Sequence, residues 1–163
     1  MKRRIVDSPI GKITLIAEEG AITGLYFGEM RQDIPPGDDE VLVRCETELA
    51  AYFSGELQEF AVPIRGAGTS FRKRVWEELC KIPYGETASY RDIAERIGNP
   101  KAVRAVGGAN HNNPISIIVP CHRVIGTNGS LTGYGGGMEA KRWLLDLETK
   151  HVCKKLGSEV SYD

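Results

Sequence analysis

Residues 89–110, SYRDIAERIGNPKAVRAVGGAN, decide the fold because they predict two short helices joined by a tight turn. Ser89 to Asp92 is a variant of the capping box that opens a helix, and Gly98 is typical of a helix end. Asn99-Pro100 then starts a second helix, which is short, built largely from small residues, and basic at its start. Two such helices have helix-turn-helix form, although the same geometry occurs in many helical cores.

The small side chains of the second helix indicate what it could bind. Alanine and glycine would let the helix approach a partner closely, but they offer few hydrogen bonds for reading bases. Arg104 is the long side chain that could fill a gap in a base stack. This pattern therefore suits binding to DNA without reading its sequence.

The chain before this segment changes from strand-like to helical patterns. Apolar runs separated by turn residues predict an antiparallel meander over Lys2–Asp7, Lys12–Ala17 and Ile22–Phe27. An amphipathic pattern predicts a helix over Val41–Phe53. Thr69 or Ser70 can cap a further helix that carries on one face Phe71, Val75, Trp76 and Leu79.

Two domains and a tail follow from this change of pattern. We expect the boundary at Pro63–Gly68, with an N-terminal α/β scaffold over residues 1–64, a second domain over residues 65–150, and a tail of unassigned role over residues 151–163. The first 64 residues carry six basic and twelve acidic residues, against fifteen and ten in the remainder. This imbalance is a weak hint of an anionic partner for the second half, but a solvated charged face explains it about as often.

Composition restricts the class of protein. The chain has 163 residues, 41% of them apolar, and a formal net charge of −1, as expected of a soluble globular protein. No apolar run approaches the ~20 residues of a membrane span and no secretion signal is visible, so we expect a cytoplasmic protein without membrane contact. The four cysteines lie far apart, which favours reduced thiols over disulfides or a zinc site.

A second stretch, Ile118-Val119-Pro120-Cys121-His122-Arg123-Val124, carries the candidate chemistry. The apolar residues over 115–119 predict a buried β-type segment, and Pro120 would end it and leave Cys121 at the mouth of a turn. A neighbouring base activates a thiol, and His122 is the candidate base. Free cysteines are often merely buried, however, and neighbours on an extended segment point apart, so His122 could reach Cys121 only through a turn or a bridging water.

Together these motifs resemble one family, the O6-alkylguanine-DNA alkyltransferases, also called methylated-DNA–protein-cysteine methyltransferases. The resemblance runs without a visible gap from Thr69 to Glu148. Its motifs are Ile82–Thr87, Ser89-Tyr90, Gly98–Ala109, Asn113-Pro114 and Val119–Val124. The opening meander and Ala51–Glu56 look like the family's N-terminal domain.

The resemblance implies an α+β fold and a repair activity. A small N-terminal antiparallel sheet with a helix, ribonuclease H-like, would pack on a mainly helical C-terminal domain with a helix-turn-helix, winged-helix-like. The protein, as a monomer, would bind double-stranded DNA containing O6-alkylguanine in the minor groove. It would flip the damaged nucleotide out and move the alkyl group to Cys121, with O4-methylthymine as a second candidate substrate.

The type of carbon that would be attacked also favours a cysteine nucleophile. Attack at an sp3 alkyl carbon forms no oxyanion and needs a soft, strong nucleophile, which a cysteine thiolate provides. The product is a thioether, which water does not readily hydrolyse, so the protein would act once. The scheme requires no cofactor and no metal, and the sequence offers no convincing ligand cluster for one.

The resemblance also assigns catalytic roles. His122 would act on Cys121 through a water, and Glu148 would orient the imidazole. Tyr90 would give a proton or hydrogen bond to a ring nitrogen of the departing base, and Asn113 would brace the site. Taken without the resemblance, Tyr90 is an amphipathic core residue and Asn113 an ordinary turn asparagine.

The remaining implied roles concern the DNA. Arg104 would insert where the flipped nucleotide had been and offset part of the unstacking, which costs about a few kcal/mol. Alternatively, it is an ordinary surface arginine. Contacts to the DNA backbone would come from Arg91, Asn99 and Thr127.

The glycine-rich loop 126–137 would wall the base pocket. Tyr134 would pack along the flipped base and the amide of Gly135, where some relatives carry serine, would meet O6. The carbonyls of Cys121 and Val124 would accept from the exocyclic amine. Thr132 stands where other members can have glycine, which bears on the tolerance of bulky alkyl groups.

Three other classes of protein remain as alternatives. A non-catalytic lesion sensor of related fold would lack the nucleophile, so Cys121 argues against it. A helix-turn-helix regulator would need base-reading side chains and would prefer one DNA sequence. A cysteine hydrolase would turn over repeatedly.

Overall fold

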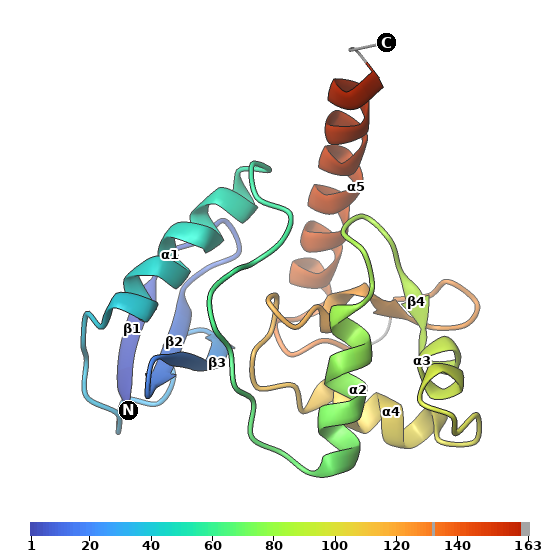
Figure 1. Ribbon diagram of the computed structural model, residues 1–163, viewed down its shortest axis with the longest axis horizontal. Helices are drawn as coiled ribbons and strands as arrows, with labels where there is room; N and C mark the ends of the chain where they lie inside the picture. Colours follow the sequence, from blue (N-terminus) through green and yellow to red (C-terminus); the bar gives the residue numbers. More distant parts are fainter. Residues whose placement is uncertain (132, 161–163) are drawn as a thin grey trace.

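The computed structural model describes residues 1–131 and 133–160 of the chain. Figure 1 shows a small antiparallel sheet beside the helix α1 (Glu40–Phe53) on one side and a group of helices on the other. The long helix α5 (Met138–Val160) projects beyond both groups. This arrangement confirms the predicted α+β fold class.

The N-terminal part is a three-stranded antiparallel sheet in the order β1-β2-β3. Its strands are β1 (Lys2–Val6), β2 (Ile13–Glu18) and β3 (Ala21–Phe27). α1 packs on this sheet, and its Leu42 and Leu49 are buried in the same core as Leu15 and Ile22. The predicted meander and helix are confirmed, with ends that differ by at most one residue.

Capping side chains start two helices of the C-terminal part. The helices before α5 are α2 (Ser70–Cys80), α3 (Tyr90–Arg96) and α4 (Val103–His111). The side chain of Thr69 accepts from the amide of Arg72 and caps α2. Ser89 and Asp92 form the predicted capping box of α3. α2 and α3 both pack on α4. α3 and α4 are the two short helices that the sequence predicts.

α4 begins later than Asn99-Pro100 predicts. The amide of Ala102 donates to the carbonyl oxygen of Asn99 (3.0 Å) and closes a turn first, so the helix starts at Val103. The amide of Asn99 in turn donates to the carbonyl oxygen of Ala94 near the end of α3 (3.0 Å). The connection between the two helices is therefore held by hydrogen bonds at both of its ends.

The predicted strand over residues 115–119 is wrong. Ile115 makes one strand-like bridge to Leu25 of β3, and residues 116–118 form a turn that the amide of Val119 closes onto the carbonyl oxygen of Ile115 (3.0 Å). Ile117 has a φ of +72°, which for a β-branched residue costs on the order of 1–3 kcal/mol. The apolar run indicated burial correctly, but burial alone does not distinguish a strand from a packed turn.

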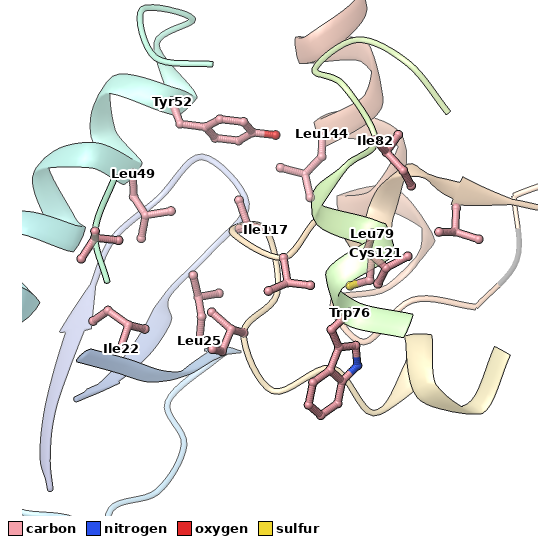
Figure 2. Packing of buried hydrophobic residues seen from close by; sticks show 14 of the residues in the cluster. Ile22, Leu25, Leu49, Tyr52, Trp76, Leu79, Ile82, Ile117, Cys121 and Leu144 are labelled. Atoms are coloured by element: carbon pink, nitrogen blue, oxygen red, sulfur yellow. The ribbon is translucent and has the colours of Figure 1, made fainter. Parts of the chain in front are cut away.

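Short strands and α5 fix the chain on either side of the Cys-His pair. β4 (Ala88–Ser89) pairs in parallel with β5 (Val124–Ile125), and α5 packs against the 3-10 helix η1 (Cys121–Arg123). Figure 2 shows the ring of Tyr52 extending from α1 toward Leu144 of α5, so the two halves share one core. None of the described helices is long and apolar enough to cross a membrane.

Candidate active site

Cys121 is the first residue of η1 and is buried, with 3% of its surface exposed. Its amide donates to the carbonyl oxygen of Val119 (2.8 Å), at the end of the turn that contains Ile117. Asn113 braces this turn: its Nδ2 donates to the carbonyl oxygen of Val119 (2.9 Å) and its Oδ1 accepts from the amide of Ile115 (3.0 Å). The backbone that carries the thiol is therefore held firmly.

A cavity of about 320 Å³ opens at Cys121, between the end of α4, the end of β3 and the glycine-rich loop. Four of the predicted site residues line it: Asn113, Cys121, Tyr134 and Gly135. Tyr134 packs edge-on against Phe27 of β3, with ring centroids 5.5 Å apart. A Cβ atom at Gly135 would meet no atom within 4 Å apart from its neighbours in the chain, so a small side chain has room there.

His122 is fully buried, and its Nε2 donates a hydrogen bond to Glu148 Oε2 at 2.7 Å. Because the carboxylate takes the proton-bearing side of the ring, Nδ1 is the basic nitrogen, and Nδ1 has no hydrogen-bond partner among the described residues. Burial lowers the pKa of His122, although Glu148 opposes this shift. The imidazole is therefore neutral at pH 7 and able to accept a proton.

The carboxylate of Glu148 accepts from two further side chains that the sequence interpretation missed, and from the amide of Gly85 (3.5 Å). Arg123 donates from Nε to Oε1 (2.8 Å) and from Nη2 to Oε2 (3.0 Å), and the hydroxyl of Tyr52 donates to Oε2 (2.6 Å). Burial alone would raise the pKa of Glu148, but hydrogen bonds from His122 and Arg123 and the charge of Arg123 bring it down to about 2. Glu148 is thus ionised at neutral pH and holds the imidazole in one orientation.

We expect acid to destabilise the fold through Glu148. The pKa of this carboxyl falls from an ordinary value of 4.5 to about 2 in the folded protein, so folding favours the ionised form. Its contribution to the free energy of unfolding, on the order of 3 kcal/mol, is present above the unfolded pKa and is lost as the pH falls through the folded pKa. Urea unfolding at a series of pH values measures this loss. Glu148→Gln should lose less stability over that range, and an equal loss would contradict the assignment.

Cys121 needs a base, because burial raises the pKa of its thiol, while Asn113, Ser116 and the charge of Lys141 oppose this rise. Lys141 is itself fully buried and donates from Nζ to the carbonyl oxygen of Val124 (2.7 Å). The resting thiol is therefore protonated. No sequence signal pointed to Lys141, since lysine is almost never fully buried unless it is paired.

The other predicted residues are not among those that line the cavity. Val124 is fully buried and Tyr90 is half-buried at the start of α3. The residues predicted to touch the DNA backbone or the base stack are exposed: Arg91, Asn99, Arg104 and Thr127. Thr132 lies outside the described residues.

These features define a class of protein: a two-part α+β protein in which a buried cysteine, backed by a histidine and a carboxylate, faces a cavity beside a pair of short helices. Residues 70–150 match the family described as 6-O-methylguanine DNA methyltransferase, DNA binding domain, and residues 1–65 match its ribonuclease-like domain. The chain belongs to the 6-O-methylguanine DNA methyltransferase family. The resemblance drawn from the sequence motifs is confirmed.

Individual relatives match over nearly their whole length. The methylated-DNA--protein-cysteine methyltransferase of Methanosarcina acetivorans is 50% identical over 149 residues, which cover 88% of this chain and 96% of the relative. The protein of the same name from Mycobacterium tuberculosis is 51% identical over 151 residues, covering 89% and 90%. The crystal structure of Mycobacterium tuberculosis OGT in complex with DNA has a TM-score of 0.88 at 50% identity and covers 93% of this chain and 94% of that one.

Proposed function

We propose that this protein repairs O6-alkylguanine in double-stranded DNA by moving the alkyl group to Cys121. The observation that carries this proposal is the geometry at Cys121, where a thiol faces a cavity beside the buried His122 that Glu148 holds. The names of the relatives and the DNA in the Mycobacterium tuberculosis complex support the same function.

The proposed reaction is a displacement at the alkyl carbon. The proton of the Cys121 thiol passes through a water to Nδ1 of His122, and the sulfur forms a bond to the alkyl carbon. The bond between that carbon and O6 breaks, and its electron pair stays on the guanine. Tyr90 assists the departing base with a hydrogen bond to a ring nitrogen. Glu148 stabilises the imidazolium that forms.

Each protein molecule acts once, because the thioether on Cys121 is not hydrolysed. This property separates the proposed function from that of a cysteine hydrolase, whose thioester product reacts with water. An assay with labelled O6-methylguanine DNA in molar excess should plateau at one repaired base per protein molecule. Continued repair beyond that plateau would contradict the proposal.

α4 would face the minor groove with its small residues. A Cβ atom at Gly107 or Gly108 would meet no other atom within 4 Å, so this surface of the helix is open to close approach. Arg104 is exposed on the same helix and makes no ion pair with the described residues. We place Arg104 in the gap that the flipped nucleotide leaves, and Arg91, Asn99 and Thr127 along the backbone.

Arg104→Ala should slow transfer from duplex DNA by roughly 10- to 100-fold, because the gap in the stack is then no longer filled. Reaction with free O6-methylguanine base should keep its wild-type rate, since no nucleotide has to be flipped. Single-turnover rates on the two substrates measure this difference. Arg96→Ala, which removes an exposed arginine at the end of α3, is the matched control. An equal loss on both substrates would assign Arg104 to the fold instead.

A further inference from the structure

Buried polar side-chain atoms without a hydrogen bond gather around Cys121. Among the described residues there are four such atoms: the hydroxyls of Tyr84 and Tyr134, Oδ1 of Asn110 and Nδ1 of His122. Asn110 and Tyr134 line the cavity at Cys121, and His122 directly follows Cys121 in the chain. A buried polar group without a partner costs about 1–3 kcal/mol, so three of them at one site indicate that a ligand completes it.

These three atoms need hydrogen-bond partners of different kinds. Nδ1 of His122 serves the proton transfer described above, and the hydroxyl of Tyr134 can donate or accept. Oδ1 of Asn110 is an acceptor only, so its partner must carry an N–H or O–H group. Of the three atoms, Asn110 Oδ1 therefore restricts the chemistry of the ligand most.

The orientation of the Asn110 amide is set by the chain itself. Asn110 lies near the end of α4 with 4% of its surface exposed, and its Nδ2 donates to the carbonyl oxygen of Cys121 (3.4 Å). Turning the amide over would bring Oδ1 against that carbonyl, which would place two acceptors face to face. The acceptor of Asn110 is thus the atom left for the ligand.

An O6-alkylated guanine offers one group that fits. Alkylation at O6 removes the proton from N1, so N1, N3, N7 and O6 are all without a proton and the exocyclic 2-amino group is the N–H donor of the base. Resting on the proposed function, we infer that Asn110 is a specificity-determining residue whose Oδ1 accepts a hydrogen bond from this 2-amino group.

The backbone acceptors predicted for the same amine already have donors. The carbonyl oxygen of Val124 accepts from Lys141 Nζ (2.7 Å), and that of Cys121 accepts from Asn110 Nδ2 (3.4 Å). The carbonyl oxygen of Cys121 also accepts from the amide of Val124, so both of its lone pairs have donors, whereas that of Val124 can accept a second hydrogen bond. Asn110 Oδ1 is thus the acceptor that gains its first partner when the base enters.

Lesions without the amine should react more slowly. O6-methylhypoxanthine has a hydrogen atom in place of the amine, and O4-methylthymine presents a carbonyl oxygen instead of an N–H donor. Either base would leave Asn110 Oδ1 buried and unpaired while it occupies the cavity. A site built to hydrogen-bond a substrate group discriminates strongly against an analogue that lacks it.

The test compares two duplexes that differ only in the amine, one with O6-methylguanine and one with O6-methylhypoxanthine. The wild-type protein should transfer the methyl group from the guanine lesion at least about 10-fold faster in single-turnover assays. Asn110→Leu, which keeps the size of the side chain and removes its polar atoms, should bring this ratio close to one. Gln32→Leu, which makes the same kind of change at an exposed amide that does not line the cavity, should keep the wild-type ratio.

The outcomes are distinguishable. Both rates come from one protein preparation, so partial loss of folded Asn110→Leu cancels in the ratio, and Asn110→Ala answers the same question if the leucine variant does not fold. A wild-type ratio near one, or an unchanged ratio in the Asn110 variant, would overturn the inference while leaving the proposed function intact. No transfer from O6-methylguanine by the wild-type protein would instead refute the proposed function.

Discussion

Replacing Cys121 by alanine should abolish alkyl transfer and leave the binding of lesion-containing DNA intact. The sulfur is the atom that would form the new bond, and no other thiol of the described residues lines the cavity. The side chain is small and 3% exposed, so its removal changes neither the helices nor the exposed residues expected to meet DNA. Single-turnover transfer of a labelled methyl group and gel-shift titration measure the two properties separately.

The matched control for this variant is Cys80→Ala. Cys80 is a free and exposed cysteine at the end of α2, and nothing in the proposed chemistry uses it. Cys80→Ala should transfer the methyl group at the wild-type rate. Residual transfer by Cys121→Ala, or loss of transfer in Cys80→Ala, would show that the nucleophile has been placed wrongly.

Glu148→Gln should lower both stability and transfer. The change leaves the guanidinium of Arg123 buried beside a neutral amide, and breaking a buried ion pair in this way costs about 3–5 kcal/mol. Transfer should fall by roughly 100-fold or more, because the amide can no longer hold the proton-bearing Nε2 of His122 and stabilise the imidazolium. Urea unfolding and single-turnover rates report the two effects.

Two further variants separate the stability effect from the catalytic effect. Tyr52→Phe removes one neutral donor from Oε2 and keeps the charge of Glu148, so it should cost about 1 kcal/mol of stability. The double variant Glu148→Gln with Arg123→Met removes the unpaired charge and should recover most of the stability without recovering transfer. If the double variant also recovered transfer, the carboxylate would be a structural group only.

The elements that the sequence predicted well are those with local signals. The cap at Thr69 and the capping box at Ser89 and Asp92 lie within a few residues of the helices that they start, so a short window contains the whole interaction. The turn before Cys121 was mistaken for a strand because its apolar residues are buried as a strand's would be. Its conformation depends on the side chain of Asn113 and on the left-handed backbone of Ile117, which no apolar pattern records.

The residues of the candidate site also differ in whether a local sequence signal predicts them. Cys121 and His122 are adjacent and could be predicted from the motif, whereas the role of Glu148 was inferred from the family resemblance. Tyr52 lies 96 residues from Glu148, so only the packing of α1 against α5 brings the two together. Lys141 belongs to α5, a helix that the sequence interpretation did not assign. Lysine side chains are usually exposed, so the full burial of Lys141 could not be predicted from its residue type.

The most direct test of the central claim is the mass of the intact protein after incubation with duplex DNA that contains a single O6-methylguanine. The proposed function predicts a gain of one methylene, saturating at one per protein molecule, and peptide mapping should place it on Cys121. Unchanged protein mass after the DNA has lost its methyl group, or a methyl group on another residue, would contradict transfer to Cys121.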